Sequence, residues 1–441
     1  MKPFRVRNAA FRRLNLLMLP LCLPLALLLR IVLRALKPWV HVRFVRWASQ
    51  SLGIWAIPTE VYLCQRDAGM HPKRSLDLFY RYDRGASQLK FSVCRASAVC
   101  NRELDRMFRR HLRLRQGAQF LDYLNRLLPR GSEEFIFTMP VNYDRDGLFE
   151  RFPAHLIFTE EQEAQGQSAL RRMGIPEGAP FVCFHVRDSA YHARWRPGLE
   201  LFYYGDRQLL DERDASIGNY LLAAERLTEL GYFCIRMGKY VAEPIQTGNP
   251  RIIDYATRYR SDFMDLYLSA RCAFFIGHNS GMTNLPILFR RPVAFANMAP
   301  LSEIIQASCP NSIFLPKRYY SGSLGRYLTL HEILSNRILL RFFMARHSHL
   351  PEIRDKLQME LHENTPEEIT ELALEMHERL QGTFQPSDED EALQSGFLAI
   401  WRFYSGVVDP VHDLRSLRMG SHFLRSHKEL LGLRGEVCLA V

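Results

Sequence analysis

The chain has 441 residues, of which 47% are hydrophobic and 24% are charged; this suits two or three globular domains and excludes a single small binding module. The net charge of +11 comes from the N-terminal segment: residues 1–50 hold ten Lys or Arg and no acid, whereas the rest has 48 basic against 47 acidic residues. This distribution argues against nucleic acid as a partner and favours a local basic segment that faces an anionic surface.

The nine cysteines are scattered and form no C-x-x-C pair, and several lie inside apolar runs. This pattern is typical of buried free thiols in a reducing compartment. Because the Cys and His residues also lack the spacing of a zinc site, the sequence predicts no bound metal.

Residues 1–40 are predicted to associate with a membrane. The apolar run Leu16–Leu29 has basic residues on both sides and contains Pro20 and Pro24. A spanning helix usually needs about 20 apolar residues, and no small-residue cleavage site follows the run as a secretory signal would require. We therefore expect an in-plane or re-entrant anchor that makes the protein peripheral or monotopic at the cytoplasmic face of the inner membrane. A tilted spanning helix and a buried core helix are the alternatives.

Residues 41–165 show a weaker pattern. We predict strands at Trp55–Leu63 and Gln88–Val93, and helices at Arg102–Leu114 and Gln119–Leu128. No glycine-rich phosphate loop occurs here. We assign this segment to an N-terminal, acceptor-side domain.

Residues 166–345 alternate short apolar strands with helices. The predicted strands are Ala179–Arg187, Tyr232–Arg236, Ile252–Asp254, Ala273–Gly277 and Pro292–Ala296. Between them, a helix starts at Asn219, and Ser261 caps a second helix over Asp262–Arg271. Continuously apolar strands are typical of a parallel sheet that is buried on both faces, so this domain is predicted to have a doubly wound, Rossmann-like α/β fold.

Residues 346–441 are predicted to form an acidic helical tail. Thr365 begins a helix with a capping box, and one face of that helix is apolar. Its stripe consists of Ile369, Leu372, Ala373, Met376 and Leu380. An exposed linker is expected at 385–393, and a final helix at Gly420–Leu433.

Ligands of doubly wound sheets bind outside the carboxyl ends of the strands. Arg187 ends the first strand, where its guanidinium can neutralise a leaving diphosphate. His185 lies on the same face of that strand, two residues earlier, and Asp188 follows at once. These three residues are the catalytic candidates. For His185, a satisfied core histidine is the alternative.

Further polar residues at this edge are candidates for binding the donor. They are Arg236, Lys239, Asp262, Asn279, Ser280 and Gly281. The basic residues can form a charge clamp, and the loop Asn279–Gly281 offers backbone and side-chain donors before a helix. The alternatives are surface ion pairs for the basic residues and helix-capping roles for Ser280 and Asp262.

Several sequence runs resemble a bacterial family of glycosyltransferases that is linked to surface polysaccharide and lipopolysaccharide synthesis. They are Phe181–Tyr191, Ile235–Gly238, Ile252–Tyr255, Ser261–Tyr267, Phe275–Gly281 and Gly420–Leu424. The resemblance extends from about Phe135 to about Leu431. More distantly, His185-Val-Arg187 is similar to the H-x-R strand of fucosyltransferase-type enzymes, although Asp188 replaces the Gly-Asp pair expected next.

The resemblance implies a GT-B-like fold with two Rossmann-like halves and a nucleotide-sugar donor as substrate. It also implies that positive side chains replace a metal at the donor phosphates, so no cofactor is expected. We predict a glycosyltransferase that acts on a cell-envelope glycan or lipid-linked acceptor, with Asp144, Asp146 and Glu150 as candidates for the general base. The alternatives are a non-catalytic envelope-assembly scaffold, or a nucleotide-sugar epimerase or hydrolase on the same fold.

Overall fold

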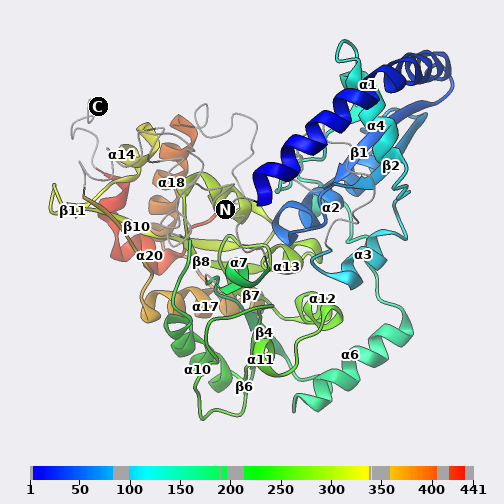
Figure 1. Ribbon diagram of the computed structural model, residues 1–441. Helices are drawn as coiled ribbons and strands as arrows, with labels where there is room; N and C mark the ends of the chain where they lie inside the picture. Colours follow the sequence, from blue (N-terminus) through cyan, green and yellow to red (C-terminus); the bar gives the residue numbers. More distant parts are fainter. Residues whose placement is uncertain are drawn as a thin grey trace. The chain divides into compact units, whose positions relative to one another are not determined.

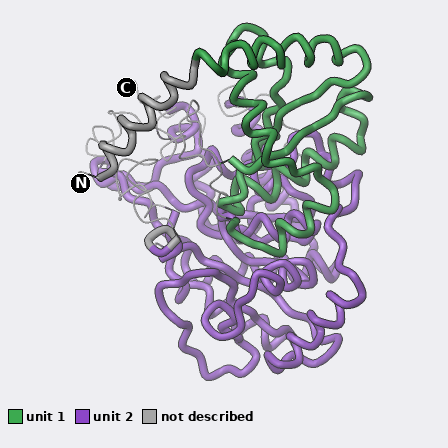
Figure 2. The backbone as a smooth tube through the Cα atoms, turned by 45° about the vertical axis from the view of Figure 1, so that its right-hand side comes forward, with its two compact units in different colours: residues 1–142 green, residues 143–441 purple. Residues whose placement is uncertain are grey.

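The computed structural model describes residues 3–82, 99–188, 190–195, 213–336, 339, 358–404 and 417–432. The chain forms two compact units, residues 1–142 and 143–441, which Figure 2 shows in green and purple. Each unit has its own parallel sheet and its own buried core.

The first unit is built on a three-stranded parallel sheet with the order β2-β1-β3. Its strands are β1 (His41–Trp47), β2 (Ser75–Arg81) and β3 (Ile136–Phe137). Its helices are α1 (Pro3–Leu36), α2 (Ala56–Asp67), α3 (Arg102–Phe108) and α4 (Ala118–Leu127), with 3-10 turns at Leu52–Ile54 and Glu133–Phe135. The predicted helices from Arg102 and from Gln119 are therefore confirmed, although α3 ends earlier than expected.

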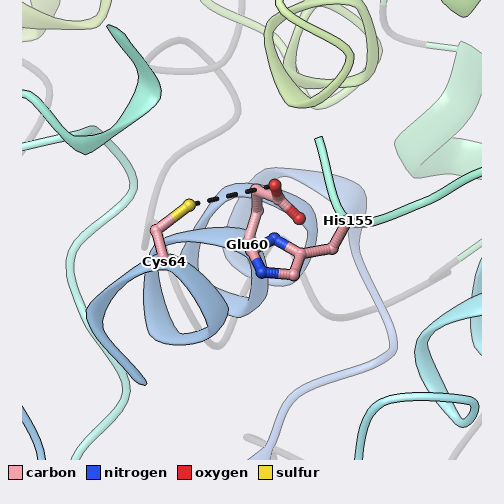
Figure 3. Close-up of side chains that lie close together, drawn as sticks. All are labelled: Glu60, Cys64 and His155. Carbon is pink, nitrogen blue, oxygen red and sulfur yellow. Dashed lines mark hydrogen bonds between the residues drawn. The ribbon is translucent and has the colours of Figure 1, made fainter. Parts of the chain in front are cut away.

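The strand predicted at Trp55–Leu63 is wrong, because this segment lies in helix α2. Nine consecutive residues of α2, Ala56 to Cys64, are buried, so no polar face marks the helical period in the sequence. Figure 3 shows Glu60 and Cys64 one turn apart on this helix, where the thiol donates to Glu60 Oε1 at 4.0 Å. The strand predicted at Gln88–Val93 lies outside the described residues.

Helix α1 has one buried and one exposed face along the part whose side chains are described, from Pro20 onward. Cys22 and Ala26 pack with Leu124 of α4. Buried Arg30 donates to the backbone oxygens of Asn125 and Leu128, both at 2.9 Å, so its charge stabilises the C-terminal end of α4. The opposite face exposes large apolar side chains: Leu21, Leu25, Leu28, Ile31 and Leu36. Among the described residues, no helix has both the length and the apolar character that crossing a membrane requires.

The second unit contains a six-stranded parallel sheet with the order β6-β5-β4-β7-β8-β9 (Figure 1). The strands are β4 (Phe181–Phe184), β5 (Phe233–Arg236), β6 (Ile252–Ile253), β7 (Phe275–Gly277), β8 (Val293–Met298) and β9 (Ile313–Pro316). Numbered along the chain within the sheet, this is the 3-2-1-4-5-6 order of a doubly wound fold. The five strands predicted from the sequence are confirmed, and β9 was missed.

The helices of the second unit connect and cover this sheet. They are α5 (Leu148–Arg151), α6 (Glu160–Arg172), α7 (Ala190–Trp195), α10 (Leu221–Glu229), α11 (Tyr255–Arg258), α12 (Asp262–Arg271), α13 (Asn284–Leu288), α14 (Leu330–Ser335), α17 (Pro366–Gln381), α18 (Asp388–Phe403) and α20 (Ser421–Ser426). There are also 3-10 turns at Ile217–Tyr220, Leu301–Ser308 and Lys428–Leu431, and a small antiparallel sheet of β10 (Arg318–Ser321), β11 (Arg326–Tyr327) and β12 (Met359–His362). The Ser261 side chain caps α12 by accepting from Met264 N, as predicted.

The C-terminal helices contact the same unit. The capping box at Thr365 is present, and α17 lies against α10 (Figure 1) with four of the five predicted stripe residues buried. The exposed linker predicted at 385–393 is wrong, because Ser387 and Asp390 form another capping box that begins α18 at Asp388. The final helix predicted over Gly420–Leu433 is shorter, since α20 ends at Ser426 and a 3-10 turn follows.

Candidate functional site

The carboxyl ends of β4 and β7 meet at the point where the strand order of the six-stranded sheet reverses. Backbone pairing continues past the end of β4, because His185 N donates to Ile276 O at 3.0 Å. One step further, Arg187 N donates to Nε2 of His278 at 3.1 Å. The residues predicted after these two strands are therefore brought together.

His278 lies at the centre of this edge and is 0% exposed. Because Nε2 accepts the Arg187 amide, the proton of the neutral ring is on Nδ1, which has no hydrogen-bond partner among the described residues. Burial lowers the pKa of His278 well below its usual value, and the positive charges of Arg187, Arg213 and Lys317 lower it further. His278 is thus a neutral histidine that is surrounded by basic groups.

Three cationic side chains gather here, which we call the cationic cluster: Arg187, Arg213 and Lys317. Arg187 Nε lies 3.3 Å from Asp214 Oδ1, and Lys317 Nζ donates to the backbone oxygen of Asp214 at 2.7 Å. Arg213 Nη2 donates to the backbone oxygen of Asn279 at 2.6 Å. Lys317 is only 3% exposed. Positive charge gathered at a partly desolvated sheet edge favours the binding of an anion.

His185 is held by the strand next to its own. Its Nδ1 lies 3.0 Å from the backbone oxygen of Met237, which can only accept, so Nδ1 carries the proton. Burial lowers the pKa of His185 to about 4, against a smaller raising effect of the Met237 hydrogen bond, and the charges of Arg236 and Arg187 also lower it. The ring is therefore neutral near pH 7, and it fixes the end of β4 to the segment after β5.

Asp188 and Arg236 are engaged within the fold. Both carboxylate oxygens of Asp188 accept backbone N–H groups, from Ala190 at 2.9 Å and Ala242 at 2.8 Å. Arg236 is 2% exposed and donates to Asp254 Oδ1 at 3.1 Å and to the Glu243 backbone oxygen at 3.0 Å. The structure thus places Arg236 in a buried ion pair with Asp254, and Asp188 in contact with the backbone of two loops.

Lys239 and Asp262 were also predicted to bind the donor. Lys239 Nζ lies 5.8 Å from the centre of the Tyr240 ring, in the loop after β5. Asp262 occupies the first turn of α12, where it pairs with Arg260. The helix-terminus role considered for Asp262 fits this position.

The loop Asn279–Gly281 follows β7, as predicted. Asn279 is 1% exposed, and its Nδ2 donates to the Ala299 backbone oxygen at 2.7 Å, while its Oδ1 has no partner among the described residues. Ser280 Oγ lies 3.0 Å from Thr283 Oγ1 and accepts from Thr283 N at 3.4 Å, so it acts as a local cap. Gly281 lies in the same loop, half-buried.

Three residues of this site were not predicted from the sequence: His278, Arg213 and Lys317. His278 lies between a predicted strand and a predicted site loop. It is a polar residue directly after a strand, the same criterion by which Asn279 was predicted. Lys317 follows the apolar strand β9 directly, so it would have been found if Ile313–Pro316 had been identified as a strand. Arg213 lies in the long insertion after β4, which has no regular pattern in the sequence.

The candidates for the general base are placed beside α5. Asp144 Oδ2 accepts Phe149 N at 2.6 Å and its Oδ1 accepts Asp146 N at 3.3 Å. Asp144 therefore braces the turn before α5. Glu150 lies in α5 itself.

Comparison with known proteins gives no matching family model and no matching curated protein. Among solved structures, the chain is similar to a glycosyl transferase of family 9 from Veillonella parvula DSM 2008, at 13% identity and a TM-score of 0.35, over 63% of this chain and 86% of that one. It is also similar to the ADP-heptose lps heptosyltransferase II of E. coli (11% identity, TM-score 0.31, 63% and 90% covered) and to the wall teichoic acid polymerase TagF (10%, 0.27, 87% and 100%). At these TM-scores the likenesses do not establish a shared fold.

Proposed function

We propose that the second unit binds the diphosphate of a nucleotide sugar, and that the protein is a glycosyltransferase. The observation that carries this proposal is the cationic cluster of Arg187, Arg213 and Lys317 at the switch point of a 3-2-1-4-5-6 sheet. Guanidinium and ammonium groups in this position suit phosphate oxygens. The resemblance of Phe181–Tyr191 and Phe275–Gly281 to surface-polysaccharide glycosyltransferases supports the same activity.

In the proposed reaction the cluster acts on the leaving group. The bond between the sugar and the diphosphate breaks as the acceptor attacks, and negative charge develops on the departing diphosphate. Arg187 would contact these oxygens, Lys317 would add a second charge, and Arg213 would close the site from the insertion. Because side chains supply the positive charge, the proposed reaction needs no metal ion. A cell-envelope glycan or a lipid-linked molecule is the proposed acceptor.

Calorimetry with UDP and GDP tests the donor site. We expect one of these nucleotides to bind the full-length protein, also in the presence of EDTA, and Lys317→Met to weaken that binding about 10-fold or more, as the loss of a charge-assisted contact implies. Arg226→Met is the control, since Arg226 is an exposed residue of α10 that pairs with Glu229. Binding that Lys317→Met leaves intact would remove Lys317 from the site. If neither nucleotide bound, the scaffold alternative would be favoured.

The apolar face of α1 supports the proposal that the protein binds an anionic membrane surface at the cytoplasmic face of the inner membrane. Deleting residues 1–40 would also remove Arg30 and Leu33 from the core of the first unit, so substitutions on the exposed face are a sharper test. The exposed leucines Leu21, Leu25 and Leu28 offer such a test.

We expect the triple change of Leu21, Leu25 and Leu28 to serine to abolish co-sedimentation with phosphatidylglycerol vesicles. Each leucine that is withdrawn from the bilayer costs about 1.5–3 kcal/mol of binding free energy. The control changes three exposed leucines of the second unit to serine: Leu230, Leu324 and Leu380. Equal sedimentation of the two triple variants would refute the membrane role of α1.

A further inference from the structure

The first unit contains a cavity of about 540 Å³ that none of the functions above uses. It lies beside the C-terminal half of α2, the loop that leads into β2, the strand β2 itself and the segment 111–113. Ser75, Asp77 and Phe79 alternate along β2, so the cavity lies against one face of this strand. Its lining residues, as far as the structure describes them, all belong to the first unit, so this site is separate from the cationic cluster.

Asp77 is the one carboxylate among the described lining residues, and an arginine already neutralises it. Asp77 Oδ1 accepts from Arg43 Nε at 2.6 Å, and its Oδ2 accepts from Arg43 Nη2 at 2.7 Å. Oδ2 also accepts the hydroxyl of Tyr62 at 2.6 Å. Such a bidentate, largely buried arginine–carboxylate pair leaves little negative potential at the floor of the cavity.

The rim of the cavity is basic. Arg66, Lys73 and Arg113 line it and are exposed. Arg66 makes an exposed ion pair with Asp67 at 3.2 Å, which is worth little in water, and donates to the His111 backbone oxygen at 3.2 Å. An anion that enters the cavity would therefore meet cations on three lining segments.

His71 lines the wall and is held in place by Arg43. Arg43 Nη2 can only donate, so its contact of 2.8 Å with His71 Nδ1 makes Nδ1 the acceptor and places the ring proton on Nε2. Nε2 is itself buried, so the ring shapes the wall and the charged groups for an anion come from the rim.

The loops next to the cavity expose large apolar side chains. Met70, which precedes His71, is 55% exposed, and Trp39 in the connection from α1 to β1 is 66% exposed. The two loops are hydrogen-bonded, because His41 N donates to Arg74 O at 2.8 Å and Arg74 Nη1 donates to Pro38 O at 3.4 Å. Exposed tryptophan next to basic residues is typical of surfaces that meet lipid headgroups.

We propose that this cavity binds a phosphate group, carried by a membrane lipid or free in solution. Lys73 and Arg113 supply charge from two lining segments, and Arg66 of α2 adds to it. The inference does not depend on the transferase activity, because no residue of the second unit takes part.

Phosphate binding by the purified full-length protein tests the site. Inorganic phosphate is titrated by calorimetry, and vesicles of phosphatidylcholine with or without phosphatidic acid are assayed by co-sedimentation. We expect the double variant Lys73→Ala/Arg113→Ala to bind inorganic phosphate about 10-fold or more weakly, since two charge-assisted contacts are lost. The matched control is Arg106→Ala/Arg109→Ala, which removes two exposed charges at the C-terminal end of α3 in the same unit. Both changes affect exposed side chains, and circular dichroism checks that the variants fold.

The vesicle arm distinguishes the two sources of phosphate. A loss of phosphatidic-acid-dependent sedimentation only in the Lys73/Arg113 variant, together with competition by inorganic phosphate, supports the lipid headgroup. Weaker binding of inorganic phosphate with unchanged sedimentation supports free phosphate. Phosphate binding that is absent, or that is equal in both double variants, overturns the proposal.

Discussion

Replacing Arg187 with alanine is expected to lower the turnover of sugar transfer by about 10²-fold or more, the usual effect of removing one preorganised contact to developing charge. Arg187 is held in place before a substrate arrives, because its backbone amide donates to His278 and its guanidinium lies beside Asp214. Such a side chain needs little reorganisation when the leaving diphosphate forms. Its loss should therefore appear mainly in kcat, with a smaller effect on donor affinity.

The measurement is steady-state release of the nucleoside diphosphate, with the donor that calorimetry identifies. Arg187→Lys keeps the charge but loses the planar fork, and should retain part of the activity. Arg226→Ala on α10 removes an exposed arginine of the same unit and should have no effect. Turnover of Arg187→Ala at the wild-type level would show that Arg187 does not contact the reacting diphosphate.

The sheet of the second unit could be predicted from the sequence because its strands are buried on both faces. Phe181–Phe184 and Phe275–Gly277 are entirely buried, and each stands out as an apolar run between turn residues. Strand β9 has the same buried, apolar character, but it ends in Pro316, Pro310 lies just before it, and it was not predicted. Because β9 was not predicted, Lys317 was not predicted as a site residue either. A residue at a strand end can be identified only when the strand itself has been identified.

The first unit was harder to predict because the spacing of apolar residues in its apolar runs does not distinguish a helix from a strand. Trp55 to Leu63 is buried on all sides of helix α2, so neither alternation nor a helical stripe is visible. Tertiary contacts decide the outcome: Trp47 Nε1 donates to Thr59 Oγ1 at 2.9 Å, a pairing over 12 residues that no local pattern encodes. The same holds at the site, where Asp214 lies beside Arg187 although the two residues are far apart in the sequence.

Arg236 shows how a strand end can mislead. The sequence places it beside Arg187 on the neighbouring strand, and the register pairs Phe184 with Arg236, so both belong to the carboxyl edge. Yet its guanidinium is buried against Asp254.

Replacing Arg236 with methionine is therefore expected to lower the free energy of unfolding by about 3–5 kcal/mol, because Asp254 is left as a buried charge without its cation. Urea unfolding followed by circular dichroism measures the change.

A double variant separates this structural role from a role in donor binding. Asp254 also accepts from Ile245 N at 3.1 Å and from Thr257 Oγ1 at 2.7 Å, so an asparagine oxygen can keep part of these bonds without a charge. Arg236→Met/Asp254→Asn should accordingly regain part of the lost stability, and should bind the donor nucleotide as the wild type does. If Arg236 instead contacted the donor diphosphate, restoring stability through residue 254 would leave the donor affinity low. The prediction fails if Arg236→Met unfolds like the wild type, or if the double variant folds stably but no longer binds the nucleotide.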